Sequence, residues 1–194
     1  ESTISQIRKL DMIGANISMP YKQKVFPYLD EVDEMARKIG SVNTIVHRDG
    51  KLKGYNTDGI GFFRSLPPAF SIKGKTMVLL GAGGAALAII AQAIHLGVKR
   101  ILVFVREERL VHYRSIVQLI EEGFDFLIEL YAIEKDEDVQ SSFNQADLIL
   151  NATGVGMDGQ SLPIASHLTF PPQALIVEMA YYPAVPPFLQ LAVN

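Results

Sequence analysis

The stretch Thr76–Leu96, with the sequence TMVLLGAGGAALAIIAQAIHL, decides the fold of this chain. Its first part, Met77–Leu80, is continuously apolar and predicts a buried β-strand. Closely spaced glycines then predict a tight turn, and the apolar run that follows predicts a helix from about Ala85 to Gly97. The glycines of the turn are Gly81, Gly83 and Gly84.

The spacing of the small residues in this turn indicates a site for a dinucleotide. Gly81-x-Gly83-x-x-Ala86 fits the pattern whose last position is Gly or Ala. Gly81 permits the tight turn, Gly83 lets a pyrophosphate touch the backbone, and Ala86 lets the helix pack closely on the strand. The start of the helix adds free N–H groups and the positive end of the helix dipole, and both favour phosphate.

Two other interpretations compete with the dinucleotide site. No charged residue lies between Lys75 and Lys99, which is the hydropathy pattern of a membrane span, although the glycines weaken that interpretation. A glycine turn can also bind nothing, because this pattern alone is weak evidence. The next segment favours the cofactor, since Arg100–Val105 predicts a second buried strand. This strand runs into Arg106-Glu107-Glu108, where a βαβ unit places the side chains that contact the adenine ribose.

Composition limits the class of protein. The 194 residues suit one large domain or two small ones, and a formal net charge of −3 gives no basic footprint for nucleic acid or an anionic membrane. The chain has no cysteine, which is compatible with a reducing compartment, and we expect a cytoplasmic protein. It opens with Glu1-Ser2-Thr3, without Met and without the lead of a signal peptide, so a fragment or a processed product is an alternative. No metal is expected, because the four histidines do not show the spacing of metal ligands; they are His47, His95, His112 and His167.

The first third of the chain predicts short helices and strands. The elements are a helix over 3–10, a strand over 14–19, a helix opened by Pro20 and running through Lys24, a helix over Glu31–Ile39, strands over Ser41–His47 and Leu52–Tyr55 around the turn Asp49-Gly50, and a helix over Ile60–Leu66. From spacing alone, Lys22 is an ordinary solvated lysine, Asp58 a helix N-cap, and Asn43 a strand residue satisfied by its neighbours.

After a linker over Pro67–Gly74, strands alternate with helices. Besides the two strands and the helix already described, the predicted elements are helices over Leu110–Glu122 and Asp136–Asn144, strands over Phe126–Ile133, Asp147–Leu150 and Ala174–Met179, and a last helix over 183–194. Alternation of this length predicts right-handed βαβ units and a parallel sheet with both faces covered, hence an α/β fold. Asn151–Met157 follows a strand at the edge where such sheets bind ligands.

Several blocks of the chain resemble the shikimate dehydrogenase family. GANISMPYK at Gly14–Lys22, SVNT at Ser41–Thr44 and GYNTDG at Gly54–Gly59 resemble three signature blocks of that family, in the right order ahead of the glycine turn. Asn151-Ala152-Thr153 and Met179–Pro183 extend the resemblance over nearly the whole chain. Ser18-Met19-Pro20 together with Ile72–Met77 is most similar to the quinate/shikimate dehydrogenase branch, which oxidises either acid and can use NAD.

The resemblance implies a role for individual residues. Lys22 and Asp58 match the catalytic pair that flanks the reacting hydroxyl, although whether Lys22 acts as a base or as a charged positioner stays open. The positions that match substrate contacts are Ser18, Lys22, Asn43, Asp58 and Tyr181. The positions that match cofactor contacts are Ala82, Gly83, Gly84, Ala85, Arg106, Glu107, Glu108, Gly154, Met179, Ala180 and Tyr181.

The choice of cofactor depends on the loop after the second strand. NADP readers of the family carry Asn-Arg-Thr there, whereas this chain has Val105-Arg106-Glu107-Glu108. An acidic side chain can accept a hydrogen bond from a free ribose 2′-hydroxyl and repels a 2′-phosphate, whereas Arg106 attracts one. We therefore expect NAD or NADP as the cofactor, with NAD favoured.

The resemblance also implies a two-lobed architecture. Residues 1–66 form an N-terminal α/β substrate domain that lacks the family's first strands, 67–183 form a C-terminal Rossmann-like dinucleotide-binding domain, and 184–194 begin a helix that returns to the substrate domain. The family's opening strand, with its Ser-x-Ser motif, would precede Glu1, and its closing Gly-x-x-Met-Leu…Gln segment would follow Asn194.

The leading hypothesis is a dehydrogenase that interconverts shikimate and 3-dehydroshikimate, and also quinate and 3-dehydroquinate, with NAD or NADP. Its partner is the small-molecule substrate, with no nucleic acid and no membrane, and a homodimer is compatible. One alternative is a truncated, non-catalytic relative that holds a dinucleotide or a quinate-like ligand. Another is a two-lobed NAD(P) enzyme acting on a folate, which fits the three blocks poorly.

Overall fold

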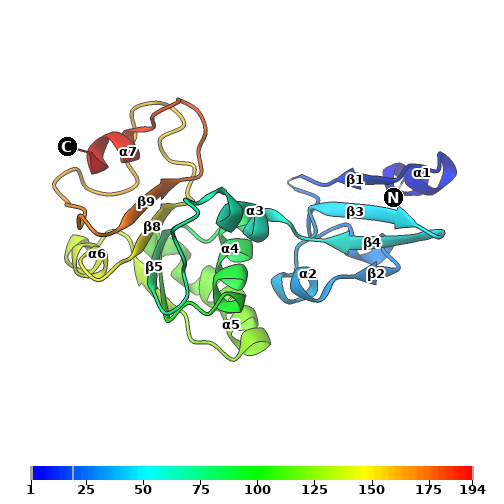
Figure 1. Ribbon diagram of the computed structural model, residues 1–194, viewed down its shortest axis with the longest axis horizontal. Helices are drawn as coiled ribbons and strands as arrows, with labels where there is room; N and C mark the ends of the chain where they lie inside the picture. The colour runs from blue at the N-terminus through cyan, green and yellow to red at the C-terminus, as the bar shows by residue number, and fades with distance from the viewer. Residues whose placement is uncertain (1, 19, 194) are drawn as a thin grey trace.

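Two sheets organise the chain, one in each of two lobes (Figure 1). The computed structural model describes residues 2–18 and 20–193. The predicted strand end at Met19 and the predicted helix end at Asn194 lie outside the described residues.

The first lobe contains a four-stranded sheet in the order β1-β3-β4-β2. Its elements are α1 (Ser2–Lys9), β1 (Gly14–Asn16), the 3₁₀ turn η1 (Phe26–Tyr28), β2 (Glu31–Val32), α2 (Glu34–Ile39), β3 (Thr44–Arg48) and β4 (Lys51–Tyr55). The hairpin between β3 and β4 is confirmed, because Asp49 and Gly50 both have positive φ values, 51° and 74°, as a tight two-residue hairpin turn requires.

Two predicted helices of this lobe differ in the structure. The helix expected after Pro20 is wrong, since the described residues there form turns followed only by η1. Pro27 explains this result, because proline lacks an N–H donor and its ring clashes with the preceding helical turn. The helix predicted from Glu31 begins instead at Glu34, because Asp33 is its N-cap and accepts a hydrogen bond from the Met35 N–H at 3.1 Å.

The second lobe contains a five-stranded sheet in the order β7-β6-β5-β8-β9, in which every pairing is parallel. Its elements are α3 (Asp58–Ser65), β5 (Thr76–Leu80), α4 (Gly84–His95), β6 (Arg100–Val105), η2 (Glu107–Arg109), α5 (Leu110–Phe124), β7 (Glu129–Ala132), α6 (Asp136–Phe143), β8 (Leu148–Asn151), β9 (Leu175–Glu178) and α7 (Pro187–Ala192). The predicted parallel α/β sheet is therefore confirmed. Two bounds shift: β7 begins three residues later than expected, and α7 begins at Pro187, after Pro186 as its N-cap.

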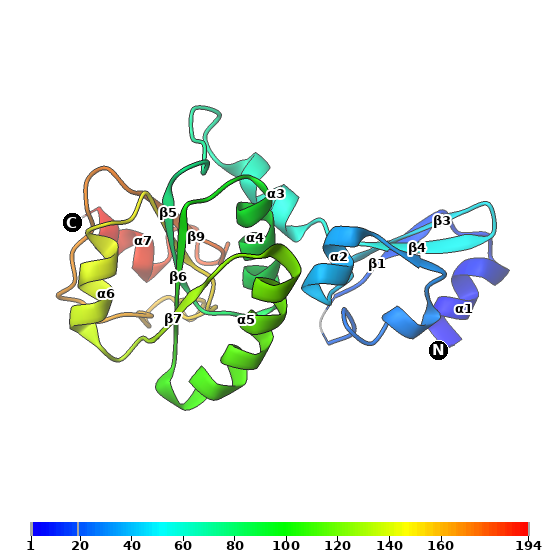
Figure 2. The ribbon, with the colours of Figure 1, turned by 90° about the horizontal axis from the view of Figure 1, so that it is seen from below.

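Helices cover both faces of this sheet, with α4 and α5 on one face and α6 and α7 on the other (Figure 2). Successive side chains of β5 enter different cores. Met77 and Leu79 lie in the cluster under α4 and α5, whereas Val78 and Leu80 lie in the cluster under α6 and α7. Because β5 is buried on both faces, its residues are apolar without alternation. The membrane-span interpretation is wrong, because α4 has only 12 residues.

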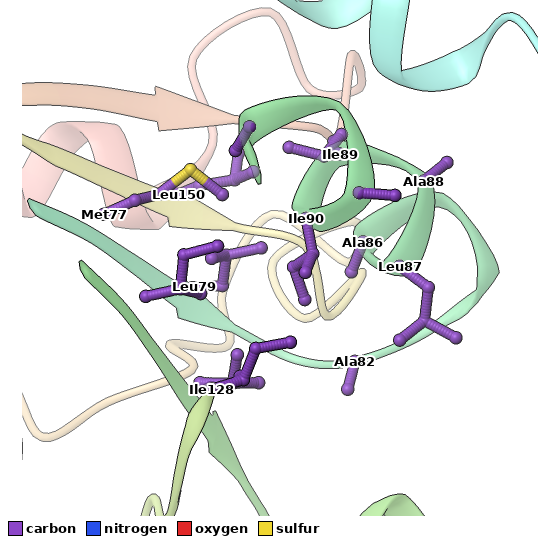
Figure 3. Packing of buried hydrophobic residues seen from close by; sticks show 14 of the residues in the cluster. Met77, Leu79, Ala82, Ala86, Leu87, Ala88, Ile89, Ile90, Ile128 and Leu150 are labelled. Atoms are coloured by element: carbon purple, nitrogen blue, oxygen red, sulfur yellow. The ribbon is translucent and has the colours of Figure 1, made fainter. Parts of the chain in front are cut away.

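Small residues bring α4 close to β5, as Figure 3 shows around Leu79, Ala86 and Ile90. Ala86 is 1% exposed and Ile90 is fully buried, and α4 is buried on all sides from Ala86 to Ala93. The close packing fixes the start of α4, which begins at Gly84, next to the carboxyl end of β5.

Two helices join the lobes. Phe62 and Phe63 of α3 pack in the core of the second lobe, and Gly59 lies so close to α4 that an added Cβ would be 2.7 Å from the Gln92 Cβ. Ile39 and Met35 of α2, from the first lobe, also pack in that core. By its packing α3 thus belongs with the second lobe, although it lies within the first 66 residues.

Candidate functional site

Three residues that are far apart in the sequence meet between the lobes. The Lys22 Nζ donates to the Asp58 Oδ2 at 2.6 Å, and the Asn43 Nδ2 donates to the Asp58 Oδ1 at 2.7 Å. The side chains of Lys22 and Asp58 are only 20% and 24% exposed. The interpretation of Lys22 as an ordinary solvated lysine is therefore wrong.

The backbone explains why these residues converge. Asn43 directly precedes β3, and its N–H donates to the carbonyl of Tyr55, the last residue of β4, at 2.9 Å. The carbonyl of Lys22 accepts from the Val42 N–H at 2.9 Å, which ties the turn that carries Lys22 to the same end of the hairpin. Asp58 begins α3 a few residues after β4, so the end of the hairpin and the start of a helix hold all three side chains.

Asp58 is the first residue of α3, and the expectation that it is the N-cap is wrong. Thr57 is the N-cap, and it makes no side-chain capping bond. The Asp58 N–H instead donates to the Asn56 Oδ1 at 3.0 Å, and the buried Asn56 donates to the Ser41 carbonyl at 3.0 Å. Both carboxylate oxygens of Asp58 are thereby left to contact Lys22 and Asn43.

Asn43 is satisfied by its neighbours, as expected, and it also orients the start of α3. Its Oδ1 accepts from the Thr57 N–H at 3.0 Å and from the Thr44 hydroxyl at 2.9 Å. Because an amide has two donors and two acceptor positions, these bonds fix which face of Asn43 points to Asp58.

The glycine turn after β5 has the geometry that a dinucleotide phosphate requires. Gly81 has φ +95°, and an added Cβ would lie 3.1 Å from the Ala152 carbonyl oxygen, so only glycine fits there. At Gly83 and Gly84 an added Cβ would meet no heavy atom within 4 Å, so the backbone faces open space at the start of α4. These residues fit a pyrophosphate held on a helix N-terminus.

A cavity of about 700 Å³ lies at this turn. Its lining includes Gly81, Ala82 and Gly83 from the turn, Arg106 and Arg109 after β6, Tyr113 of α5, Glu134 after β7, and Thr153 and Val155 after β8. All of these segments follow the carboxyl ends of neighbouring parallel strands, which is the edge where ligands bind in such sheets.

Two smaller cavities connect the start of α4 to the Lys22–Asp58 pair. One is lined by Ala85 together with Asp58 and Met179. The other is lined by Gly84 together with Lys22 and Ser41. The glycine turn and the Lys22–Asp58 pair thus lie around one helix terminus.

The loop after β6 contains the three residues predicted to contact the adenosine, and their cofactor contacts stay a prediction. Glu108 lies 3.2 Å from Arg106 in an exposed ion pair, and the Glu107 N–H donates to the Glu134 carboxylate at 3.0 Å. Neither Glu107 nor Glu108 lines the large cavity, whereas Arg106 and Arg109 do. The Arg109 guanidinium lies 5.7 Å from the ring centre of Tyr113, a cation–π contact that holds it against α5.

The remaining candidates lie around these cavities or outside them. Ser18 is exposed and lines a different cavity, with Tyr21 and Tyr28. Tyr181 is 90% exposed and lies outside the hydrogen-bonded group around Asp58. Gly154 has φ +77° in the loop after β8, and the Ala180 N–H donates to the Glu178 carboxylate at 2.9 Å.

A turn at Asp158 anchors the far end of the loop after β8, next to Leu162 and Pro163 in the cavity wall. The Asp158 carboxylate accepts from the hydroxyl and the N–H of Ser161 and from the Gln160 N–H. These hydrogen bonds lower the pKa of Asp158 to about 2, and the bond from the Ser161 hydroxyl has the largest effect.

Sequence reasoning missed Arg109, Tyr113 and Glu134. Glu134 directly follows the predicted strand Phe126–Ile133, so the rule that ligands bind at the carboxyl edge could have identified it. Arg109 lies one helical turn after Arg106, a spacing that brings two side chains to the same side.

Within residues 2–18 and 20–193, no cluster of three or more His, Asp or Glu side chains could hold a metal ion. No helix in the same ranges is long and apolar enough to cross a membrane.

Fold and site together define a two-lobed α/β protein with a Rossmann-like parallel sheet. Residues 1–45 match the family described as the shikimate dehydrogenase substrate binding domain. A shikimate dehydrogenase (NADP(+)) of Streptococcus gordonii is 51% identical over 192 residues, covering 99% of this chain and 67% of the relative. The chain belongs to the shikimate dehydrogenase family.

Solved structures agree with this assignment. Shikimate 5-dehydrogenase from Listeria monocytogenes, in complex with shikimate and NAD, is 34% identical with a TM-score of 0.90, over 98% of this chain and 67% of that one. Quinate dehydrogenase from Corynebacterium glutamicum, in complex with NAD, is 28% identical with a TM-score of 0.84, over 99% and 67%. The chain spans about two thirds of the length of the curated relatives that it matches.

Proposed function

We propose that the chain carries the active site of an NAD(P)-dependent shikimate dehydrogenase. The observation that carries this proposal is the Lys22–Asp58–Asn43 group beside the glycine turn at the start of α4. Shikimate is the first substrate to test because relatives of about 50% identity are named for it. Quinate is the second, because a quinate dehydrogenase shares the fold at 28% identity.

Lys22 and Asp58 are the residues proposed to bind the reacting hydroxyl. The Lys22 ammonium has three donors and uses one on Asp58, so two remain for a substrate oxygen. Oxidation of the alcohol to a ketone releases a hydride and a proton; the nicotinamide, when bound, accepts the hydride. Because a charged ammonium cannot accept a proton, the Asp58 carboxylate takes the hydroxyl proton, either directly or through Lys22, and releases it to solvent, while Asn43 holds Asp58 in place.

Ser18 and Tyr181 are proposed as further substrate contacts, on the resemblance alone. Both are exposed in the structure, and neither belongs to the hydrogen-bonded group of Lys22, Asn43 and Asp58. The domain limits at 66 and 183, a homodimer and a cytoplasmic location stay predictions of the same proposal.

The cofactor is proposed to occupy the large cavity on Ala82 and Gly83 and to pass Gly84 and Ala85, which line the two smaller cavities, toward Met179 at the nicotinamide. Gly154 and Ala180 are proposed at the nicotinamide on the resemblance alone. We propose that NADP is the better cofactor and that NAD is also used. The preference for NAD rested on the acidic residues after Arg106, but Glu108 pairs with Arg106 instead of lining the cavity. Arg109 lines the cavity without an ion pair among the described residues, and Arg106 lines it with donors other than the one that faces Glu108, so both can contact a 2′-phosphate.

The direct test mixes the 194-residue chain with shikimate or quinate, each with NAD or NADP, and follows the absorbance of the reduced nicotinamide. Reduction with either acid supports the enzyme, and the four rates rank the substrates and cofactors. If the folded chain binds a dinucleotide but reduces it in none of the four mixtures, the proposed enzyme activity is rejected and the non-catalytic binding module is supported. The Lys22→Ala variant should lose the reduction, and Lys99→Ala, which changes an exposed lysine on a loop, is its control.

A further inference from the structure

A hydrogen-bond network centred on the buried Asn151 connects the loops that follow β8 and β9. Asn151 is fully buried, and its Nδ2 donates to the Glu178 Oε2 at 2.6 Å and to the Val155 carbonyl at 3.1 Å. Its Oδ1 accepts from the N–H and the hydroxyl of Thr153, at 3.1 and 2.7 Å. Asn151 therefore uses both donors and both acceptor positions of its amide, and cannot rotate without losing bonds.

Glu178 is the link from this network to the second loop. Its other oxygen, Oε1, accepts from the Ala180 N–H at 2.9 Å. Among the ion pairs of the described residues, none includes Glu178. Its carboxylate therefore accepts from two donors, one on the last residue of β8 and one in the loop after β9.

The two loops line different cavities of the proposed cofactor site. Thr153 and Val155 line the large cavity at the glycine turn. Glu178 and Met179 line the cavity that also contains Asp58. A shift of one loop against the other would change the distance between the two ends of a bound dinucleotide.

We propose that Glu178 is a positioning residue, which holds the loop after β9 so that the nicotinamide end of the dinucleotide lies against the Asp58 cavity. This inference rests on the proposed function. The proposed role of Glu178 requires two acceptor oxygens, because the Asn151 Nδ2 and the Ala180 N–H both donate to its carboxylate. Glutamine has nearly the same shape but only one acceptor oxygen, so its NH₂ group would face one of these donors.

The test compares Glu178→Gln with wild type and with Glu137→Gln, which removes the same charge from an exposed position on α6. Affinity is measured for NADP and for 2′-phospho-ADP-ribose, which lacks the nicotinamide, and kcat is measured with shikimate. We expect Glu178→Gln to lower the affinity for NADP and the kcat by about tenfold each, while the affinity for the fragment changes by less than about twofold. Glu137→Gln should match wild type in all three measurements.

The outcomes separate this inference from the proposed function. Equal loss of affinity for NADP and for the fragment would overturn it, because the network would then support the whole site. Unchanged NADP affinity and kcat, or a Glu178→Gln chain that does not fold, would overturn it as well. A wild-type chain that binds neither ligand would instead reject the proposed function, and the inference with it.

Discussion

Replacing Gly59 with alanine is expected to force α3 away from α4. The new Cβ would lie 2.7 Å from the Gln92 Cβ and closer still to the Ala88 carbonyl oxygen. An ordinary contact begins at 3.4 Å, so the helices must separate by at least about 0.7 Å to relieve the contact with Gln92, and by more to relieve the contact with Ala88. Overpacking of this kind costs about 1–3 kcal/mol.

Gly61, on the same helix, is the matched control. An added Cβ there meets no heavy atom within 4 Å, so Gly61→Ala gains helix propensity without a clash. Both substitutions receive a propensity gain of up to about 1 kcal/mol, so the difference between them measures mainly the clash. At about 2–4 °C per kcal/mol for a chain of this size, Gly59→Ala should melt about 2–12 °C below Gly61→Ala.

The assay is thermal unfolding followed by circular dichroism, together with steady-state kinetics well below the melting temperature. Asp58 immediately precedes Gly59, and a misplacement of 1 Å can cost about 10²-fold in rate, so we expect a loss of about tenfold in kcat/KM. Melting temperatures of Gly59→Ala and Gly61→Ala within about 1 °C of each other would refute the reasoning, because α3 and α4 would then accommodate the added methyl group without a loss of stability.

Three further predictions concern the site and the sheet edge. Lys22→Ala should nearly abolish turnover while the dissociation constant for the dinucleotide stays within about twofold, because Lys22 lies at the proposed substrate hydroxyl; wild-type turnover would contradict its role. Arg109→Ala should lower kcat/KM with NADP by about tenfold and leave kcat/KM with NAD nearly unchanged, and Arg48→Ala, at an exposed position, is the control. An equal loss of kcat/KM for both cofactors would exclude a contact between Arg109 and the 2′-phosphate. The hydrogen bond from Arg100 lowers the pKa of Glu129 below 4.5 in the folded protein. The ionised Glu129 therefore stabilises the folded state fully above pH 4.5, and this stabilisation is lost as the pH falls through the lowered pKa. The difference in melting temperature between wild type and Glu129→Gln should therefore shrink in acid, and a constant difference would reject this linkage.

The second lobe was the more predictable part of the fold. Buried parallel strands are continuously apolar, and Gly81 and Gly97 mark the turns on either side of α4, so both type and order of the elements follow from the sequence. The first lobe was harder, because its elements are short and depend on single residues. Pro27 prevents the helix after Pro20, and the Asp33 cap moves the start of α2.

The candidate site was predictable through the resemblance, and much less from spacing. Nothing local to Lys22 distinguishes it from a solvated lysine, because its burial comes from the hairpin and from α3. Glu108 was assigned to the cofactor by its position after β6, but its ion pair with Arg106 depends on side-chain geometry that the pattern does not contain. Arg109 and Tyr113 contact each other only because η2 continues into α5.

The packing of Ile39 and Met35 from α2 into the core of the second lobe has a consequence for motion. A hydrophobic anchor at this point prevents the lobes from sliding or separating freely, since either movement would expose apolar side chains to water. A movement that leaves Ile39 and Met35 in that core would open the lobes without this cost. Because Ile39 also lines the cavity that contains Lys22, such a movement would be centred beside the proposed reacting groups.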